Sequence, residues 1–228
     1  MSDMQPKSTS RLNKFIADST GMSRRAADSA IDEKRVRVNG AFPEQGMRVT
    51  ESDNVTLDGQ PIAPLETKTI MFNKPAGYIV SRDGQGSDTI YDILPKKFQH
   101  LKPVGRLDKD SSGLLLLTND GALAQELTHP RHQKTKIYHI ELSAPLAPLH
   151  RQMISDMGIQ LEDGPSRLIL DRTQEGNERA WTVTMHEGRN RQIRRTFEAL
   201  GYRVTSLHRI QFGPYRLNDL QLGKFTDV

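Results

Sequence analysis

The 228-residue sequence contains no cysteine. This absence excludes disulfides, thiolate nucleophiles, iron–sulfur clusters and cysteine-ligated zinc. Long apolar runs are also missing: the longest purely aliphatic stretch is Leu114–Leu117, whereas about 20 residues are needed to span a bilayer. The first residues, MSDMQPKSTSR, lack the continuous apolar stretch of a signal peptide. We therefore expect a soluble, cytoplasmic protein that does not bind membranes.

Charge is low overall but unevenly distributed. The net charge is +4, and residues 186–209 alone hold six arginines against two glutamates. A second basic cluster, Arg131–Lys136, has three cations and no acid. Clustered arginine on a nearly neutral chain indicates a local polyanion site, although a solvated charged face would give the same composition. The seven histidines are scattered, with no ligand-spaced pair on an obvious helix, so no metal site is predicted.

The first sixty-odd residues read as a small separate unit. Ser10 and Ser23 stand where helix N-caps are expected, and Gly21 ends the first helix. Val36 and Val38 alternate with arginines as in a strand. Further short strands are expected at Val49 and Val55–Leu57, and a linker at Gln60–Lys68. The pattern predicts domains at 10–66 and 67–228.

Longer elements follow the linker. Strands are expected at Ile70–Asn73, Leu114–Leu117, Lys136–Leu142 and Trp181–Met185, and helices after Asp120, over Leu146–Met153 and over Ile193–Leu200. This order is typical of an α+β domain with largely antiparallel strand pairing.

One loop combines several features of a catalytic segment. Gly105-Arg106-Leu107-Asp108-Lys109-Asp110-Ser111-Ser112-Gly113 presents two carboxylates beside two cations, directly before the buried strand Leu114–Leu117. Loops tethered to rigid strands often carry catalytic groups. By itself, the same sequence also suits a polar surface turn.

The segment from Gly105 to Gly121 resembles the signature of the RsuA/RluB family of ribosomal RNA pseudouridine synthases. Further blocks resemble the same family in the same order: Asn73–Gly77, Lys136–Tyr138, Glu187–Arg195, Leu207–Ile210 and Gly213-Pro214. The resemblance implies a catalytic domain on a mixed, mainly antiparallel sheet flanked by helices.

The N-terminal unit resembles an S-four-type RNA-binding domain. The matching residues are Arg11–Ile16, Ser23–Ala26 and Val36–Gly40. That family usually has glycine before the strand, where this chain has Glu33-Lys34-Arg35. We therefore expect this turn to be strained or differently shaped.

The resemblance implies a mechanism and its residues. Asp108, rather than Asp110, would attack either the uracil ring or the anomeric carbon of the ribose. Arg194 would keep that carboxylate ionised. Tyr138 would stack on the flipped base and help to move its proton. Leu207 would pack beneath the site. The reaction needs no metal or organic cofactor.

Basic residues would hold the RNA in both domains. The expected contacts in the catalytic domain are Lys74, Arg106, Lys109, Arg189, Arg191 and Arg195, and in the N-terminal domain Arg24, Arg25, Arg35 and Arg37. A helix N-terminus with guanidinium groups binds phosphate by shape and charge. The expected substrate is a single uridine in a structured or loop region of ribosomal RNA, bound by a monomer.

Several alternatives fit the same residues. Alternation alone would make Tyr138 a core residue, the Lys74 segment a simple turn, and the arginines ordinary surface charge. The resemblance favours large-subunit over small-subunit RNA. A non-catalytic RNA-binding or ribosome-assembly factor, and a metal-dependent phosphoryl-transfer enzyme using Asp108 and Asp110, are the competing functions.

Overall fold

The computed structural model describes residues 9–50 and 52–228. The chain divides between Lys68 and Thr69 into two compact units. The sequence places the boundary between residues 66 and 67.

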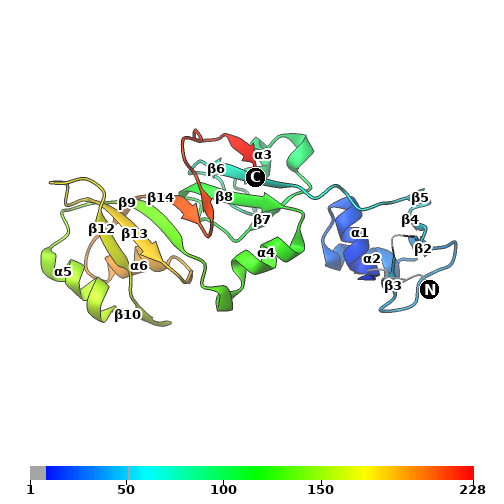
Figure 1. The fold of residues 1–228 in the computed structure, drawn as a ribbon, viewed down its shortest axis with the longest axis horizontal. Coiled ribbons are helices and arrows are strands. Elements are labelled where there is room, and N and C mark those ends of the chain that lie inside the picture. Colours follow the sequence, from blue (N-terminus) through cyan, green and yellow to red (C-terminus); the bar gives the residue numbers. More distant parts are fainter. Residues whose placement is uncertain (1–8, 51) are drawn as a thin grey trace, which may run out of the picture. The chain divides into compact units, whose positions relative to one another are not determined.

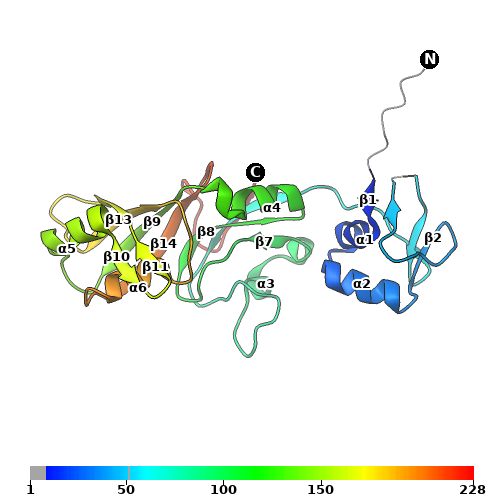
Figure 2. The same cartoon turned by 90° about the horizontal axis from the view of Figure 1, so that it is seen from below.

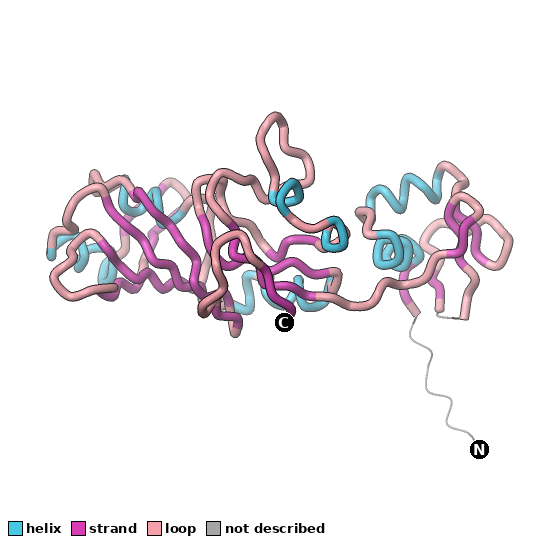
Figure 3. Tube along the Cα trace, turned by 90° about the horizontal axis from the view of Figure 1, so that it is seen from above, coloured by secondary structure: helices cyan, strands magenta, loops and turns pink. Residues whose placement is uncertain are grey.

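Two short helices and several short strands make up the N-terminal unit (Figure 3). Its elements are β1 (Ser10–Arg11), α1 (Leu12–Thr20), α2 (Arg24–Asp32), β2 (Val36–Val38), β3 (Arg48–Val49), β4 (Val55–Leu57) and β5 (Gln60–Pro61). Strands β2, β4 and β5 form an antiparallel sheet, and β1 pairs with β3. Leu12, Ile16, Ala27 and Val36 are among the residues of its core. The alternating valines Val36 and Val38 read from the sequence therefore do belong to this small core.

The ends of the two helices differ in how they are capped. Ser23 caps α2 as predicted, since its hydroxyl accepts a hydrogen bond from the backbone N–H of Ala26 at 3.0 Å. Gly21 ends α1 in the left-handed conformation, with φ 77°. Ser10 is not an N-cap, because it lies in β1 opposite Val49. A strand pairing thus takes the place of the expected cap.

Two further details of this unit concern the turn before β2 and the segment predicted as a linker. Lys34 occupies the left-handed region with φ 59° in the turn before β2, which confirms the unusual shape expected there. A non-glycine residue in this region costs roughly 1–2 kcal/mol. Gln60 and Pro61, which the sequence assigns to a linker, form strand β5 against β4.

A nine-stranded sheet is the framework of the second unit. Its strands are β6 (Thr69–Lys74), β7 (Lys102–Val104), β8 (Ser112–Thr118), β9 (Lys136–Leu142), β12 (Ile169–Arg172), β13 (Ala180–Met185), β14 (Val204–Phe212), β15 (Tyr215–Arg216) and β16 (Phe225–Asp227). A separate hairpin is formed by β10 (Ile159–Leu161) and β11 (Gly164–Ser166). The helices are α3 (Ile90–Ile93), α4 (Gly121–Thr128), α5 (Pro148–Gln152) and α6 (Gln192–Glu198), with single turns η1 (Lys96–Phe98), η2 (Pro130–His132) and the π-helix η3 (Met153–Met157).

The main sheet has the strand order β12-β13-β9-β14-β8-β6-β16, with β15 beside β14 and β7 beside β8 (Figure 1). Every pairing in it is antiparallel except that of β14 with β8. The prediction of an α+β fold with a mixed, mainly antiparallel sheet and flanking helices is confirmed.

Strand β8 is buried on both faces, which explains its unbroken aliphatic run. Leu115 and Leu117 belong to the core that includes α3, whereas Leu114 and Leu116 pack in a second cluster with Leu127 of α4. Helices α3 and α4 accordingly lie on opposite sides of this part of the sheet (Figure 2). The loop that precedes β8 is thereby tied to one of the most buried elements of the unit.

The pattern of β9 holds, whereas the helix expected over Leu146–Met153 differs from its prediction. Tyr138, Ile140 and Leu142 of β9 are buried as their alternation predicts. The helix expected over Leu146–Met153 is shorter, because it begins at Pro148 and passes into the π-helix η3. Leu149, within the expected helix, is not part of the core, since its exposed fraction is 65%.

Candidate active site

The loop between β7 and β8 carries Asp108, and a buried lysine fixes its backbone. Lys74 has an exposed fraction of 0%. Its ammonium group donates hydrogen bonds to the carbonyl oxygens of Pro75 at 3.0 Å, Asp108 at 3.2 Å and Ser111 at 2.8 Å. Burial lowers the pKa of Lys74 to about 8, although attraction to Asp108 and Asp110 acts the other way. Three carbonyl groups of its own domain enclose the ammonium group of Lys74, and the predicted contact of Lys74 with RNA stays a prediction.

Gly113 joins this loop to the sheet in a way that only glycine allows. Its φ is 106°, and a Cβ atom there would lie 2.3 Å from the carbonyl oxygen and 2.5 Å from the nitrogen of Arg209. These two residues are register partners in the parallel pairing of β8 with β14. The close approach of the two backbones therefore explains why position 113 of the motif is glycine.

The cation nearest the Asp108 carboxylate is Arg191. Nη1 of Arg191 lies 3.6 Å from Oδ2 of Asp108 and 3.3 Å from Oδ1 of Asp110. Arg191 stands just before α6 with φ 45°, in the left-handed region. This conformation turns the chain at the helix start, where the side chain can face both carboxylates.

Arg194 donates hydrogen bonds to the same loop. It donates from Nη2 to the carbonyl oxygen of Asp110 at 3.0 Å and to Oγ of Ser111 at 3.3 Å, and from Nη1 to the carbonyl oxygen of Val204 at 2.7 Å. Its ion pair is with Asp110, at 3.3 Å. Among the residues described, Asp108 forms its ion pair with Arg191. Arg194 thus holds the loop, and its charge still acts on Asp108 without a direct ion pair; its role in keeping Asp108 ionised stays a prediction.

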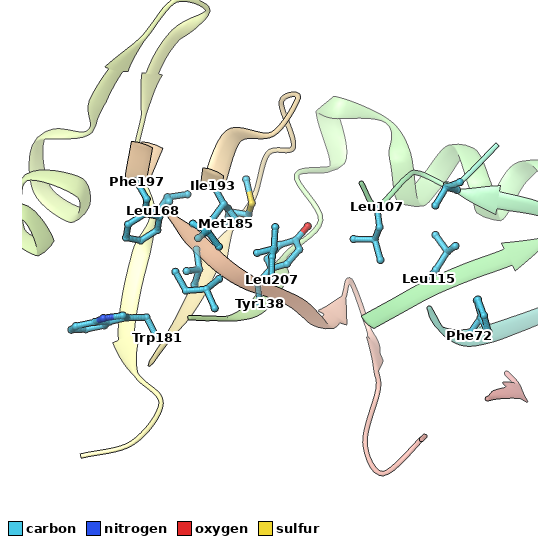
Figure 4. Packing of buried hydrophobic residues seen from close by; sticks show 14 of the residues in the cluster. Phe72, Leu107, Leu115, Tyr138, Leu168, Trp181, Met185, Ile193, Phe197 and Leu207 are labelled. Atoms are coloured by element: carbon cyan, nitrogen blue, oxygen red, sulfur yellow. The ribbon is translucent and has the colours of Figure 1, made fainter. Parts of the chain in front are cut away.

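A cavity of about 910 Å³ opens beside Asp108. Asp108, Arg106 and Arg191 line it together with Tyr138. Its apolar lining includes Leu107, Met185, Ile193, Leu207 and Phe212. Tyr138 is 7% exposed and belongs to the main core, so the core and site interpretations of this residue both apply. Figure 4 shows the buried side chains around Tyr138, with Leu207 and Ile193 among them.

Sequence reasoning missed several cavity residues, among them Lys136 and Arg209. Lys136 and Arg209 both line the cavity, and Arg209 is only 2% exposed. The sequence did contain a signal, since each residue stands in a block that resembles the family. Neither block reveals by itself that the two side chains meet.

Two of the expected RNA-binding arginines are engaged within the protein. Arg195 donates to both carboxylate oxygens of Asp163, at 3.0 and 2.7 Å, and lowers the pKa of that carboxyl group. Arg189 donates to the same carboxylate at 2.8 Å and to three carbonyl oxygens of residues 163–165. These arginines clamp the β10–β11 turn to the start of α6. Arg189 also lines the cavity, whereas Arg195 does not.

The flanking cations of the Asp108 loop differ in position. Arg106 lines the cavity. Lys109 is exposed outside the cavity and donates to Oγ of Ser87 at 3.2 Å. Arg106 is thus the better placed of the two to meet a ligand bound beside Asp108.

The arginines of the N-terminal unit also divide into two kinds. Arg24 and Arg25 are exposed at the start of α2, with Arg24 donating to Oδ1 of Asn13 at 3.3 Å. Arg35 donates to the carboxylate of Asp58 at 2.8 and 2.6 Å, which raises the pKa of Arg35. Arg37 donates to the carbonyl oxygen of Gly40 and stacks 4.1 Å from the ring centre of Phe42.

Residues 9–50 and 52–228 contain neither a cluster of metal-ligating side chains nor a helix suited to cross a membrane. No three histidine, aspartate or glutamate side chains in these ranges gather to hold a metal ion. Within the same ranges, no helix has both the length and the apolar character required to cross a membrane.

Comparisons with known proteins agree on one family. The model of the RNA pseudouridylate synthase family matches residues 68–199. An uncharacterized RNA pseudouridine synthase of Aquifex aeolicus is 37% identical over 96% of this chain and 90% of the relative. Ribosomal large subunit pseudouridine synthase B of Bacillus subtilis is 38% identical over 96% of this chain and 91% of the relative. A crystal structure of a pseudouridylate synthase superposes with a TM-score of 0.68 and 32% identity, covering 96% of this chain and 95% of the other.

Proposed function

Because the chain belongs to the RNA pseudouridylate synthase family, and is thus a pseudouridine synthase, we propose that it converts one uridine of large-subunit ribosomal RNA to pseudouridine with Asp108 as nucleophile. Relatives of 38% and 36% identity are named ribosomal large subunit pseudouridine synthase B, which favours large-subunit over small-subunit RNA. The enzyme is proposed to act as a cytoplasmic monomer.

One observation carries the catalytic assignment. The carboxylate of Asp108 and the ring of Tyr138 line a single cavity, and a guanidinium group lies 3.6 Å from the carboxylate. The cavity volume of about 910 Å³ lies within the roughly 300–1,000 Å³ typical of ligand pockets. A flipped uridine needs a carboxylate to react with, an aromatic face to stack on and apolar walls that exclude water. This cavity combines all three.

The reaction is an isomerisation, so no atom is gained or lost overall. Asp108 attacks the uracil ring or C1′ of the ribose, and the bond between N1 and C1′ breaks. The uracil rotates while it is held in the cavity, and C5 forms the new bond to C1′. The proton at C5 is then lost, N1 gains a proton, and Asp108 is released. Since no electrons are exchanged with a second reactant, the proposal requires no cofactor.

Tyr138 and its apolar neighbours would hold the rotating base. Stacking a base on an aromatic ring contributes about 1–3 kcal/mol, which offsets part of the energy lost on unstacking. Leu207 and Ile193 line the same cavity and would exclude water from the detached base.

We further propose that residues 10–66 act as the S-four-type RNA-binding domain. Arg24 and Arg25 are exposed at the start of α2, where the backbone N–H groups favour phosphate. Arg35 is held by Asp58, so its proposed contact with RNA is weaker. Binding of this kind depends on charge and falls with added salt.

Mapping of pseudouridine in ribosomal RNA tests the proposal. Cells that lack the gene should lose one site in large-subunit RNA, and the wild-type gene should restore it while Asp108→Asn should not. Asp171→Asn, an exposed carboxylate of β12 outside the cavity, is the matched control and should restore modification. Full activity of Asp108→Asn would remove the catalytic assignment, and loss of a small-subunit site would move the substrate to the other RNA.

Assays on the purified protein distinguish the proposed isomerase from two competing functions. A metal-dependent phosphoryl-transfer enzyme would be inhibited by a chelator, whereas the proposed isomerase should keep its full rate in EDTA. A non-catalytic binding factor would retain RNA without forming pseudouridine in an isolated RNA fragment.

A further inference from the structure

Lys136 and Arg209 are brought together by an irregularity in strand pairing. On β9, Lys136 and Tyr138 are two residues apart and share one face. Their partners on β14 are Phe212 and Arg209, which are three residues apart because the register shifts between Arg209 and Gln211. The extra residue allows Arg209 and Phe212 to line the same cavity as Lys136 and Tyr138.

The guanidinium of Arg209 is buried and incompletely satisfied. Its Nε donates to the carbonyl oxygen of Leu114 at 2.7 Å. Its Nη2 is buried and has no hydrogen-bond partner within the described part of the chain. Since a buried charged donor without an acceptor is costly, this nitrogen is suited to an acceptor that arrives with a ligand.

Lys136 places a second positive charge beside the first. Its ammonium group donates to the carbonyl oxygen of Glu187 at 3.1 Å. Both cations face the ring of Phe212, with Cζ of Arg209 4.9 Å and Nζ of Lys136 5.7 Å from the ring centre. Burial, followed by repulsion from Arg209, lowers the pKa of Lys136, while Glu187 acts in the opposite direction.

Protein carboxylates do not neutralise this pair. Over the described residues, neither Lys136 nor Arg209 forms an ion pair with an aspartate or glutamate. The nearby carboxylate of Glu187 is occupied by Arg189 and by the side-chain amide of Gln192. Two adjacent cations without a counter-ion favour binding of an anion between them.

We propose that Lys136 and Arg209 form a subsite for one backbone phosphate of the RNA, at a linkage that flanks the target uridine. The proposal rests on the proposed function, because RNA is the ligand that brings a phosphodiester into this cavity. Arg209 supplies a donor fixed by its hydrogen bond to Leu114, Lys136 supplies a second cation, and both pack against the ring of Phe212. The phosphate thereby sets the position of the sugar relative to Asp108.

A synthetic RNA with one neutral linkage provides the test. The RNA carries the uridine identified by mapping, and methylphosphonate replaces the phosphate on its 5′ or its 3′ side. For the wild-type protein, one of these replacements should weaken binding by roughly tenfold, as expected for loss of a charge-assisted hydrogen bond. For Lys136→Gln, the same replacement should change the affinity by less than about twofold, because one of the two cations at the phosphate is already lost. For Arg209→Lys, which keeps the charge but lacks the buried Nη2 donor, the effect should be smaller than in wild type.

The control variant changes a lysine that makes a similar contact with an aromatic ring, but outside the cavity. Lys97 lies 4.8 Å from the ring centre of Phe98 and does not line the cavity, so Lys97→Gln should behave as wild type. Arg209→Lys guards against misfolding, because it retains the charge and can still donate to Leu114. Circular dichroism of each variant reports its folding.

The outcomes distinguish this inference from the proposed function. If the unmodified RNA is isomerised but neither neutral linkage weakens wild-type binding, the phosphate subsite is wrong and the enzyme assignment stands. Equal sensitivity of Lys136→Gln and wild type to the neutral linkage would also overturn it. Absence of pseudouridine in the unmodified RNA would instead contradict the proposed function.

Discussion

The guanidinium group of Arg191 faces the carboxylate of Asp108, with 3.6 Å between Nη1 and Oδ2. The same nitrogen lies 3.3 Å from Asp110, so one cation serves two carboxylates. Arg194 binds the backbone of the same loop, donating to the carbonyl oxygen of Asp110. The proposed nucleophile is therefore held by two arginines with different tasks, one facing its charge and one fixing its position.

Replacing Arg191 should slow the reaction more than it affects folding. We expect Arg191→Gln to lower kcat by roughly tenfold, about 1.4 kcal/mol, because the carboxylate loses its neighbouring cation. Arg191→Lys should retain part of the rate, since it keeps the charge. Single-turnover assays of pseudouridine formation measure this, with exposed Arg203→Gln as the control. Equal rates for the glutamine and lysine variants would argue against a role for the charge.

Gly113→Ala should damage the junction of β8 and β14. The new Cβ would collide with the backbone of Arg209, so we expect a loss of about 1–3 kcal/mol in the free energy of unfolding. Gly121→Ala at the start of α4 is a matched control, because nothing lies within 4 Å of its Cβ and its φ is not positive. Denaturant unfolding of both variants provides the measurement. Equal free energies of unfolding for the two variants would mean that β8 and β14 can move apart at little cost in free energy.

Lys74 should leave a signature in the pH dependence of stability. Its pKa is about 8 in the folded protein, below its ordinary value of 10.5. Between these values the unfolded chain binds a proton that the folded chain does not, so the free energy of unfolding rises with pH. Lys74→Met lacks this contribution. We expect the stability of wild type relative to Lys74→Met to increase from pH 8 to pH 10.5, and a constant or decreasing difference would contradict the assignment.

The N-terminal arginines should differ in their effect on RNA binding. Arg25 is exposed at the start of α2, whereas Arg35 is held by Asp58. Arg25→Gln should weaken binding and reduce the salt slope by about 0.7–0.9, the effect of one lost phosphate contact. Arg35→Gln should change the slope less. Affinities measured over a range of salt concentrations decide this, and a larger effect of Arg35→Gln would reverse the ranking.

Sequence patterns predicted the parts of the fold that depend on local spacing. The aliphatic run of β8 and the alternation of β9 define strands because their burial repeats along the chain. The motif around Asp108 also indicated a loop that enters a buried strand. Ser10 was misassigned because its environment is set by pairing with Val49, a residue 39 positions away.

Side-chain roles were harder to predict because they depend on distant backbone. Lys74 is enclosed by carbonyl groups of a loop more than thirty residues away. Arg195 meets Asp163 across a hairpin that the sequence did not indicate. The contact of Lys136 with the ring of Phe212 depends on an extra residue in β14, which no hydrophobic period reveals. Charge and motif therefore located the site, while long-range packing assigned each cation its partner.

The register shift in β14 has a mechanical consequence. Leu207, before the shift, packs in the core with α3 and α6, whereas Phe212, after it, packs in the cluster with α4. One continuous strand thus fastens two separate apolar clusters. Deleting Ile210 would leave Phe212 opposite Lys136 but shorten the strand between Leu207 and Phe212 by one residue, so both clusters should lose packing and unfold at a lower temperature.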